Sequence, residues 1–191
     1  MVRIIAGSFR GRRLSVPEGD SVRPTGDRVR EALFSALDAR LSEGFQGKRV
    51  LDICAGSGAL GIEAMSRGAA SVVLLERDPV VCATVRKNLT LTGLTPDVAR
   101  LERTDALAYL RRPARLAFDV VFFDPPYASG LYDEVIERLA ANGWLTPAAL
   151  LVVEHPSALT PRSPESLKAV WSRRYGETSL TLFAPLESEA P

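Results

Sequence analysis

Cysteine and histidine are scarce in this 191-residue chain, and their scarcity excludes several classes of protein. Two cysteines, Cys54 and Cys82, do not form the framework of a disulfide-rich secreted domain, so a reducing cytoplasmic setting is expected. The single histidine, His155, lacks companions at metal-ligand spacing, so no metal is expected and a loop position after a strand is predicted for it. Cys54 is interpreted as a small buried residue and not as a nucleophile.

Long hydrophobic runs and a secretory leader are also missing. No stretch approaches the ~20 apolar residues of a membrane-spanning helix. The opening sequence, MVRIIAGSFRGRR, is too polar for a signal peptide. Hydrophobic residues nevertheless make up 46% of the chain, which is enough for the core of one domain. We expect a cytoplasmic monomer without a membrane partner.

Charge is nearly balanced overall, at +1, but basic residues concentrate near the N-terminus. Residues 1–30 carry seven arginines against three acids, so this segment is positive and the remainder is negative. A basic segment on a slightly acidic body is typical of a surface that binds a polyanion. A solvated surface with chance clustering is the alternative.

Apolar periodicity predicts strands that alternate with helices. Two short strands flank a glycine turn, and a helix and five buried strands with intervening helices follow before a closing pair of strands. The expected strands cover 2–6, 12–16, 49–54, 71–76, 97–103, 118–124 and 149–155, and the helices cover 27–41, 58–68, 79–91, 105–112 and 132–143. The closing strands flank a turn at 175–177, and Trp144 and Trp171 are assigned to core or edge packing.

This alternation predicts a doubly wound (Rossmann-like) α/β fold with right-handed crossovers and a parallel sheet. The closing strands predict an antiparallel hairpin at or near one edge of that sheet. We expect an N-terminal β-hairpin extension over residues 1–25, the main domain over 26–186 and a flexible tail over 187–191.

Glycines cluster directly after the first buried strand, in the sequence LDICAGSGALG. Gly56, Gly58 and Gly61 form a G-x-G-x-x-G pattern between a strand and a helix, which is the context in which that pattern binds a ligand. Glycines let a ligand approach the backbone, and the helix N-terminus offers free N–H groups. The pattern alone fits a dinucleotide or S-adenosylmethionine, and a tight turn that needs glycine only for packing is the alternative.

Acidic residues favour S-adenosylmethionine. Asp52 precedes the glycines, where a carboxylate would repel a pyrophosphate but attract the ammonium of a methionine moiety. Glu76 ends the next strand, where an acid can hold both ribose hydroxyls, and Asp105 follows the third strand, where it can accept from the adenine amino group. The expected cofactor site comprises Asp52, Ala55, Gly56, Ser57, Gly58, Glu76, Arg77, Asp105 and Ala106.

The sequence Asp124-Pro125-Pro126-Tyr127 follows the fourth buried strand and opens onto the same edge of the sheet. The exocyclic amine of guanine or adenine is a weak nucleophile, because its lone pair is delocalised into the ring. The Asp124 carboxylate and a carbonyl of the proline segment can grip the two N–H groups, since prolines lack competing donors. Tyr127 can stack on the base, and Asp124 can accept the proton after methyl transfer. A proline-rich turn capped by Asp124 is the alternative.

These motifs resemble the class I S-adenosylmethionine-dependent amino-methyltransferases, and the N-terminal sequence narrows the resemblance. The stretch RIIAGSFRGRRLSVPEGDSVRPTGDRVREALFSAL is similar to the RsmD family, bacterial enzymes that methylate guanine N2 in 16S ribosomal RNA of the small subunit. The resemblance extends from Arg3 to about Leu182. It implies a methyltransferase fold with an N-terminal hairpin extension, S-adenosylmethionine as the cofactor and action on an assembling ribosomal particle. It also implies that the segment from Asp124 to Tyr127 holds the target base.

With a base-modifying site expected, the basic N-terminal segment is interpreted as an RNA-docking surface, because the planar guanidinium of arginine suits phosphate. Structural roles stay open at two places: Arg23 can pair with an acid of the core, and Thr25 or Asp27 can cap the following helix. The candidate RNA contacts are Arg10, Arg12, Arg13, Arg23, Thr25, Arg28 and Arg30.

Three other functions are compatible with parts of the pattern. An adenine N6 methyltransferase on DNA or RNA would share the glycine loop and the Asp-Pro-Pro-Tyr corner, although 191 residues leave little room for a DNA-recognition domain. A nicotinamide oxidoreductase would share the glycine loop and leave that corner unexplained. A catalytically silent RNA-binding or assembly factor would not need the acids at 76, 105 and 124.

Overall fold

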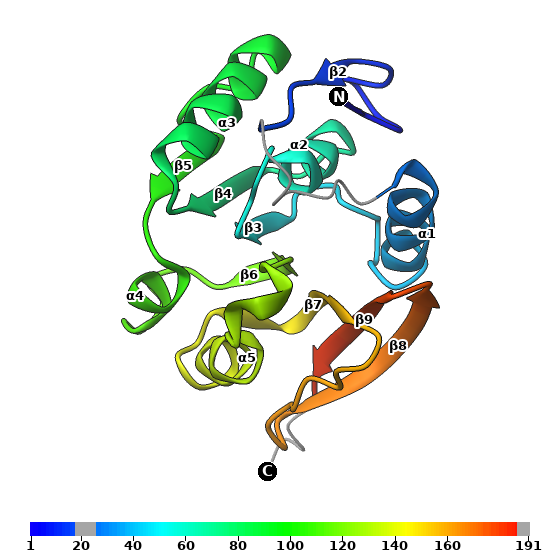
Figure 1. The fold of residues 1–191 in the computed structure, drawn as a ribbon, viewed down its shortest axis with the longest axis vertical. Helices are drawn as coiled ribbons and strands as arrows, with labels where there is room; N and C mark the ends of the chain where they lie inside the picture. The colour runs from blue at the N-terminus through cyan, green and yellow to red at the C-terminus, as the bar shows by residue number, and fades with distance from the viewer. Residues whose placement is uncertain (18–25, 187–191) are drawn as a thin grey trace.

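A mostly parallel sheet with helices on both faces forms the body of the computed structural model, which describes residues 1–17 and 26–186 (Figure 1). Within these residues the main sheet has seven strands in the order β5–β4–β3–β6–β7–β9–β8. In chain order the strands are β3 (Arg49–Ile53), β4 (Ser71–Glu76), β5 (Ala99–Arg103), β6 (Phe118–Phe123), β7 (Leu145–Pro156), β8 (Leu167–Tyr175) and β9 (Thr178–Pro185).

Helices cover the two faces because consecutive strand residues point to opposite sides of a sheet. In β6, Val120 and Phe122 pack in one apolar cluster, whereas Val121 and Phe123 pack in the other. Residues of α1, α2 and α3 complete the first cluster, and residues of α4 and α5 complete the second. The helices are α1 (Asp27–Asp38), α2 (Ala59–Ser66), α3 (Pro79–Thr92), α4 (Ala106–Leu110) and α5 (Tyr132–Ala141). The predicted doubly wound α/β architecture is confirmed.

The chain changes direction across the sheet at β3. From β3 it proceeds outward through β4 to β5, and it then returns to place β6 on the other side of β3. Open parallel sheets bind ligands at such a switch point, outside the carboxyl ends of the strands. The glycine loop follows β3 and the Asp-Pro-Pro-Tyr corner follows β6, so the fold brings both predicted motifs to this point.

The closing strands form the predicted antiparallel hairpin at one edge. β9 pairs antiparallel with β7, and β8 pairs with β9 at the outside. Trp144 is buried and stacks on Phe118, with ring centroids 6.2 Å apart, while Trp171 packs half-buried on the edge strand. Both tryptophans therefore pack as predicted.

The loop role predicted for His155 is wrong, whereas the strand expected over 149–155, which includes this residue, is present in β7. His155 lies inside β7 and is buried, and its Nε2 is 2.9 Å from the Thr181 hydroxyl oxygen on β9. The strand continues past the apolar run because β9 supplies a hydrogen-bonding partner as far as Pro156.

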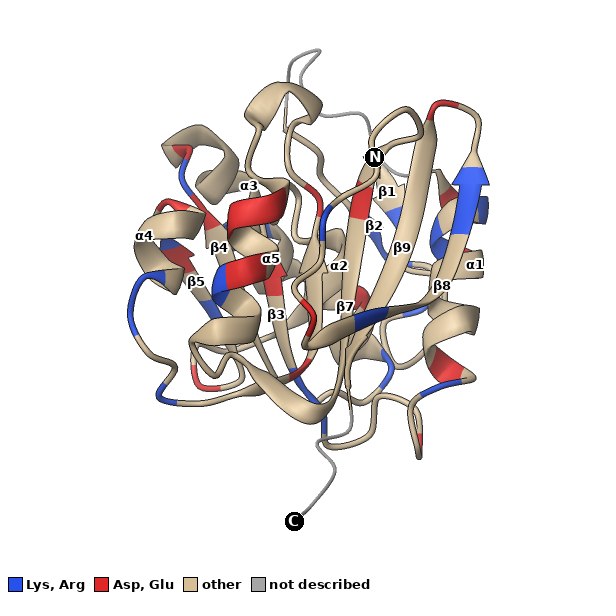
Figure 2. Cartoon of the chain, turned by 90° about the horizontal axis from the view of Figure 1, so that it is seen from below, with Lys and Arg blue, Asp and Glu red and all other residues tan. Residues whose placement is uncertain are grey.

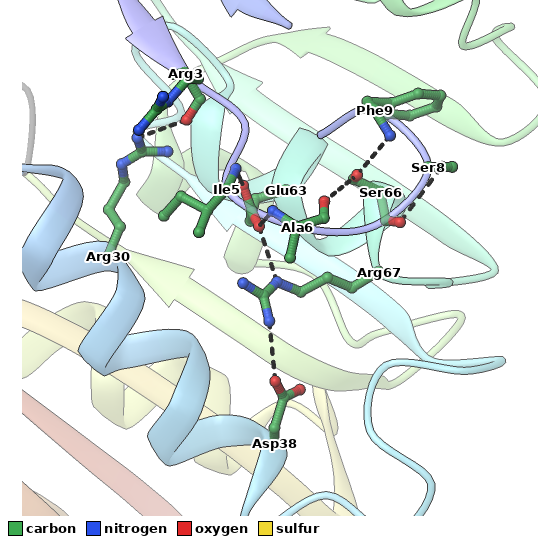
Figure 3. Close-up of polar contacts among 10 residues, drawn as sticks. All are labelled: Arg3, Ile5, Ala6, Ser8, Phe9, Arg30, Asp38, Glu63, Ser66 and Arg67. Atoms are coloured by element: carbon green, nitrogen blue, oxygen red, sulfur yellow. Dashed lines mark hydrogen bonds and ion pairs between the residues drawn. The ribbon is translucent and has the colours of Figure 1, made fainter. Parts of the chain in front are cut away.

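The N-terminal segment forms the predicted hairpin, but its strands are short. The strand expected over 2–6 ends early, because the N–H groups of Ile5 and Ala6 donate to the carboxylate of Glu63 in α2 at 2.7 and 3.0 Å (Figure 3). These donors are therefore not available to a neighbouring strand. The two strands are β1 (Val2–Arg3) and β2 (Arg13–Leu14).

Ser66, at the end of α2, fixes the same segment a second time. Its hydroxyl donates to the Ala6 carbonyl at 2.5 Å and accepts from the Phe9 N–H at 2.9 Å, while its carbonyl accepts from the Ser8 N–H at 2.8 Å (Figure 3). Between these contacts, Gly7 has a φ of 78°, and a Cβ there would lie 1.7 Å from the Ser66 carbonyl oxygen. Only glycine permits this approach. Residues 1–17 are called the N-terminal arm below.

Several element ends differ from the prediction. α1 ends at Asp38, β5 begins at Ala99, and β7 begins at Leu145, which pairs with Phe118 before a shift in the register between β6 and β7. The suggested cap by Asp27 is wrong, because Gly26 is the N-cap of α1 and the Asp27 carboxylate pairs with Arg30 instead. Thr25, the other suggested cap, lies outside the described residues, as does Arg23.

Candidate active site

The glycine loop leaves β3 through residues with left-handed backbone conformation. φ is 61° at Cys54, 55° at Gly56 and 76° at Gly58, which is the N-cap of α2. The loop closes on itself where the Gly58 N–H donates to the Ala55 carbonyl at 2.7 Å. Ala55 and Gly56 are partly exposed, whereas Ser57 and Gly58 are buried. The first half of the loop is therefore the part that a ligand can reach.

Asp52 lies beneath this loop and is buried. Its Oδ2 accepts a hydrogen bond from the Gly61 N–H at 2.9 Å, and a Cβ at Gly61 would lie 3.1 Å from the same oxygen. Burial, reinforced by the charge of Glu76, raises the pKa of Asp52 to about 7 despite the hydrogen bond from Gly61. The carboxylate thus holds the start of α2 against β3, and its contact with an ammonium group stays a prediction.

Glu76 ends β4 beside the glycine loop. Its Oε2 accepts from the Gly56 N–H at 3.2 Å, and its Oε1 accepts from the Asp78 N–H at 2.9 Å. Each carboxylate oxygen can accept more than one hydrogen bond, so ribose hydroxyls can still be bound there. The neighbouring Arg77 is exposed. The role of Glu76 in holding a ribose stays a prediction.

Asp105 caps a helix, a role that the sequence analysis missed. It is the N-cap of α4, where its Oδ1 accepts from the Ala108 N–H at 3.1 Å. The side chain is exposed at the carboxyl edge, and the buried Ala106 begins the helix. An Asp directly before a helical segment is a known sequence signal of an N-cap, so this role could have been predicted from the sequence.

The Asp-Pro-Pro-Tyr corner lies directly beside the glycine loop. The Asp124 N–H donates to the Ile53 carbonyl at 3.5 Å, which joins the ends of the two neighbouring strands. Pro125 is buried, while Pro126 and Tyr127 are exposed. Tyr127 begins a 3-10 turn (Tyr127–Ser129), and its hydroxyl is hydrogen-bonded to the Thr178 hydroxyl. The structure therefore brings an acceptor, a rigid turn and an aromatic ring together at the switch point.

Glu154 is a site residue that the sequence analysis missed. Phe123 pairs with Val153 across β6 and β7, so Glu154 follows at the same level as Asp124. It is buried, and alternation along the strands places it on the same face of the sheet as Asp124 and Asp52. The signal was an acid at the end of the fifth buried strand, in the sequence LVVEH, where His155 drew attention instead.

Carboxylates dominate the electrostatics of the switch point. Burial raises the pKa of Asp124 well above its usual value, and the charges of Glu154 and Asp52 add to the effect. Burial and the charges of neighbouring acids, led by Glu76, raise the pKa of the Cys54 thiol to about 12, so Cys54 is a half-buried thiol and not a nucleophile. A site of this character favours a cationic ligand and disfavours an anionic one.

Metal-ligand clusters and membrane-spanning helices are both missing from residues 1–17 and 26–186. No group of three or more His, Cys, Asp or Glu side chains there is placed to hold a metal ion. No helix in that part of the chain is long and apolar enough to cross a bilayer.

The predicted RNA contacts divide into three groups. Arg10, Arg13 and Arg28 are exposed, and Arg12 is exposed while donating to the Leu91 carbonyl at 2.5 Å. Arg23 and Thr25 lie outside the described residues. Basic side chains are not confined to the N-terminal region, since Figure 2 shows further ones on β8.

The prediction of Arg30 as an RNA contact is wrong. Arg30 is 1% exposed, and its Nη2 donates to the Arg3 carbonyl at 2.8 Å (Figure 3) and to Asp27 Oδ1 at 2.7 Å. It lies on the inner face of α1, where it joins that helix to β1. Apolar periodicity did not reveal this position, because a charged residue occupies a place on the buried side of the helix.

The sheet order, the glycine loop and the Asp-Pro-Pro-Tyr corner define a class I methyltransferase. Solved structures agree on the fold: the ribosomal protein L11 methylase from Lactobacillus delbrueckii subsp. bulgaricus superposes with a TM-score of 0.65 at 20% identity, covering 84% of this chain and 80% of that one. A likeness at this identity concerns the fold alone.

Comparison of the whole chain gives its family. The family described as conserved hypothetical protein 95 matches residues 2–184, and the chain belongs to it; this is the RsmD family of methyltransferases. The chain is 39% identical over 183 residues to ribosomal RNA small subunit methyltransferase D of Haemophilus influenzae, covering 95% of this chain and 93% of that one. It is 43% identical over 153 residues to the Escherichia coli K12 protein of the same name, covering 80% and 74%.

Solved structures with higher identity support the same grouping. yhhF from Escherichia coli has a TM-score of 0.85 at 36% identity and covers 98% of this chain and 99% of that one. TTHA0928 from Thermus thermophilus has a TM-score of 0.80 at 36% identity and covers 97% and 100%. The likeness therefore includes the N-terminal arm as well as the sheet.

Proposed function

We propose that this methyltransferase transfers a methyl group from S-adenosylmethionine to N2 of a guanine in 16S ribosomal RNA, within the small subunit or its precursor. The observation that carries the proposal is the adjacency of the Asp124 corner and the glycine loop at the switch point, joined by the hydrogen bond between Asp124 and Ile53. The relatives named small subunit methyltransferase D support the choice of RNA. A ribosomal substrate is consistent with a cytoplasmic monomer.

The residues around the loop fit S-adenosylmethionine. Bound there, this cofactor would supply an electrophilic methyl group on a cationic sulfonium. Gly56 and Ala55 offer an approachable backbone, Glu76 would hold the ribose, and Asp105 would accept from the adenine amino group. The buried acids, led by Asp52, favour a ligand that carries an ammonium and a sulfonium. Ser57, Gly58, Arg77 and Ala106 complete the proposed surroundings.

The corner after β6 would hold the guanine. Asp124 and a carbonyl of the Pro125–Pro126 segment would accept the two N–H groups of N2, which fixes the direction of the nitrogen lone pair. Tyr127 would stack on the base, and its hydrogen bond to Thr178 keeps the ring close to the C-terminal hairpin. Asp124 would accept the proton that leaves nitrogen, and its raised pKa makes it a better base than an ordinary carboxylate. Positioning of this kind accounts for most of the rate enhancement that the site can offer.

The N-terminal arm and the start of α1 would dock the RNA. Arg10, Arg12 and Arg13 are exposed on one hairpin, and Arg28 is exposed at the start of α1. Arg23 and Thr25 belong to the same proposal. The division into an N-terminal extension of residues 1–25, a catalytic domain of 26–186 and a tail of 187–191 remains part of it.

The deciding experiment is analysis of ribosomal RNA from cells that lack this protein. Mass spectrometry of nuclease fragments should show the loss of one N2-methylguanine from 16S RNA. Small subunits purified from those cells should then accept one methyl group from S-adenosylmethionine and the wild-type protein, at that same nucleotide. An unchanged set of methylated guanines would contradict the proposal.

Adenine N6 methylation is the second candidate, because the Asp-Pro-Pro-Tyr corner can grip either exocyclic amine. The same digest separates the two candidates, since N6-methyladenosine and N2-methylguanosine are different nucleosides. A nicotinamide oxidoreductase is disfavoured because it would leave the Asp-Pro-Pro-Tyr corner unexplained.

A further inference from the structure

A single buried amide joins the N-terminal arm to the cofactor loop. Asn88, on α3, is 0% exposed and makes three hydrogen bonds to backbone groups. Its Oδ1 accepts from the Ser15 N–H at 2.9 Å, and its Nδ2 donates to the Ser15 carbonyl at 2.9 Å. The remaining Nδ2 hydrogen goes to the Ser57 carbonyl at 2.8 Å. The amide therefore binds the arm and the glycine loop at once.

The partners fix the orientation of this amide. The Ser15 N–H requires an acceptor, whereas the Ser15 and Ser57 carbonyls require donors. A rotated amide would place its NH₂ group against an N–H and its oxygen against a carbonyl. Aspartate, of the same shape, would lack both donors. Among the common side chains of this size, only asparagine satisfies all three partners.

The contact differs from the attachment of the arm to α2. Glu63 and Ser66 hold residues 5–9 to α2 (Figure 3), and their hydrogen bonds to the arm do not involve the glycine loop. Asn88 holds Ser15, beyond β2, and also holds the loop residue that precedes Gly58. A shift of the arm at Ser15 therefore strains the bond to Ser57, whereas a shift at Ala6 does not.

We propose that Asn88 is a positioning residue that sets the cofactor loop and couples its position to that of the N-terminal arm. This proposal rests on the proposed function, since it takes the loop as the cofactor site and the arm as the RNA-docking surface. Docking of RNA on the arm would then strengthen cofactor binding. By linkage, bound cofactor would strengthen RNA docking by the same factor.

The test compares two isosteric replacements on the buried side of α3. Asn88→Leu removes the bridge, whereas Thr92→Val removes a hydroxyl that bonds only to the Asn88 and Leu89 carbonyls of its own helix. Affinity for S-adenosylhomocysteine is measured by titration calorimetry, alongside melting temperature. Asn88→Leu should weaken binding roughly tenfold, because a buried acceptor in the loop is left unpaired, while Thr92→Val should change it less than twofold.

Two further variants separate positioning from folding. Ser15→Pro removes the N–H group that donates to Asn88 Oδ1 and leaves α3 intact. It should therefore weaken S-adenosylhomocysteine binding several-fold, and this result can be obtained even if Asn88→Leu does not fold. Ser66→Ala loosens the arm at α2 and should leave that affinity unchanged. Equal effects of Ser15→Pro and Ser66→Ala would overturn the proposal, as would wild-type affinity in a folded Asn88→Leu.

Coupling is measured by repeating the titrations with saturating small ribosomal subunits. Wild-type protein should bind S-adenosylhomocysteine more tightly in their presence, and Asn88→Leu should lose that gain. If the affinity of the wild-type protein for S-adenosylhomocysteine is the same with and without the subunits, the proposed coupling is wrong. If the wild-type protein does not bind S-adenosylhomocysteine at all, the proposed function is wrong, and so is this inference, which rests on it. Binding without dependence on Asn88 removes this inference alone.

Discussion

The Tyr127 hydroxyl is hydrogen-bonded to the hydroxyl of Thr178, the first residue of β9. This bond ties the corner that follows β6 to the antiparallel hairpin at the edge of the sheet. Because Tyr127 remains 46% exposed, its ring is held at one end while a face stays available to a base. The contributions of the ring and of the hydroxyl can therefore be separated by substitution.

Tyr127→Ala should lower methyl transfer to small subunits by roughly 10- to 100-fold, because stacking on an aromatic ring stabilises an unstacked base. Tyr127→Phe keeps the ring and loses the bond to Thr178, so it should stay within about fivefold of wild type by the modest net value of one hydrogen bond. Rates under single-turnover conditions provide the comparison. Equal losses in both variants would show that the hydroxyl, and not the ring, is what matters.

Asp124→Ala should abolish methyl transfer, with a loss of at least roughly 100- to 1,000-fold, because it removes the acceptor that orients the amine. Affinity for S-adenosylhomocysteine should change little, since the glycine loop and Glu76 are intact. Asp124→Asn keeps one acceptor oxygen but cannot take the proton. Its rate of methyl transfer should therefore fall between the rates of Asp124→Ala and the wild-type protein. Substantial turnover by Asp124→Ala together with a large loss of cofactor affinity would contradict the assignment of Asp124 to the base.

Replacing Arg10, Arg12 and Arg13 together by alanine should weaken binding to small subunits and flatten its salt dependence. The slope of log affinity against log salt should become less steep by about 2–3, near 0.7–0.9 for each phosphate that the arm no longer binds. Arg111, Arg112 and Arg115, exposed on the connection into β6, provide a control with the same change in charge. An equal change of slope in the control would assign the effect to net charge and not to the arm.

Gly7→Ala should destabilise the protein more than Gly11→Ala. Both residues have positive φ, 78° and 83°, but a Cβ meets the Ser66 carbonyl at Gly7 and nothing within 4 Å at Gly11. Left-handed strain alone costs about 1 kcal/mol, so Gly11→Ala should lower the melting temperature by roughly 2–4 °C. Gly7→Ala should lower it further by displacing the arm from α2. Identical melting curves for the two variants would show that the contact with Ser66 contributes nothing.

Stability of the ligand-free protein should fall as pH rises from about 4 to about 7. The pKa of Asp52 is raised to about 7 in the folded protein and is near 3.8 in the unfolded chain. Between these values the folded state binds more protons than the unfolded state, so unfolding becomes easier with rising pH. Asp52→Asn retains an acceptor for Gly61 and should reduce this dependence, measured as melting temperature at pH 5 and pH 7.5. If melting temperature depends on pH in Asp52→Asn as it does in the wild-type protein, a group other than Asp52 is responsible for the dependence.

The order of strands and helices could be predicted because apolar runs and glycine breaks mark each element independently of its neighbours. The glycine loop and the Asp-Pro-Pro-Tyr corner were found for the same reason, since each motif is continuous in sequence. Their adjacency followed from the rule that parallel strands present their carboxyl ends at one edge.

Pairings between distant segments could not be predicted in this way. Glu63 and Asn88 looked like ordinary polar residues on helices, because their partners in the arm are 57 or more residues away. Arg30 was misassigned for the same reason: a charged side chain on the inner face of a helix is recognised only when its backbone acceptor is known. Glu154 needed the register of β6 and β7 to be seen as a neighbour of Asp124.

The attachment of the arm to α2 has a consequence for synthesis of the chain. Ile5 and Ala6 emerge first, yet the carboxylate that receives them belongs to residue 63. Closing so large a loop carries an entropic cost that the chain meets only after α2 has formed on the sheet. Until Glu63 has been synthesised and α2 has formed, the arm therefore lacks this attachment.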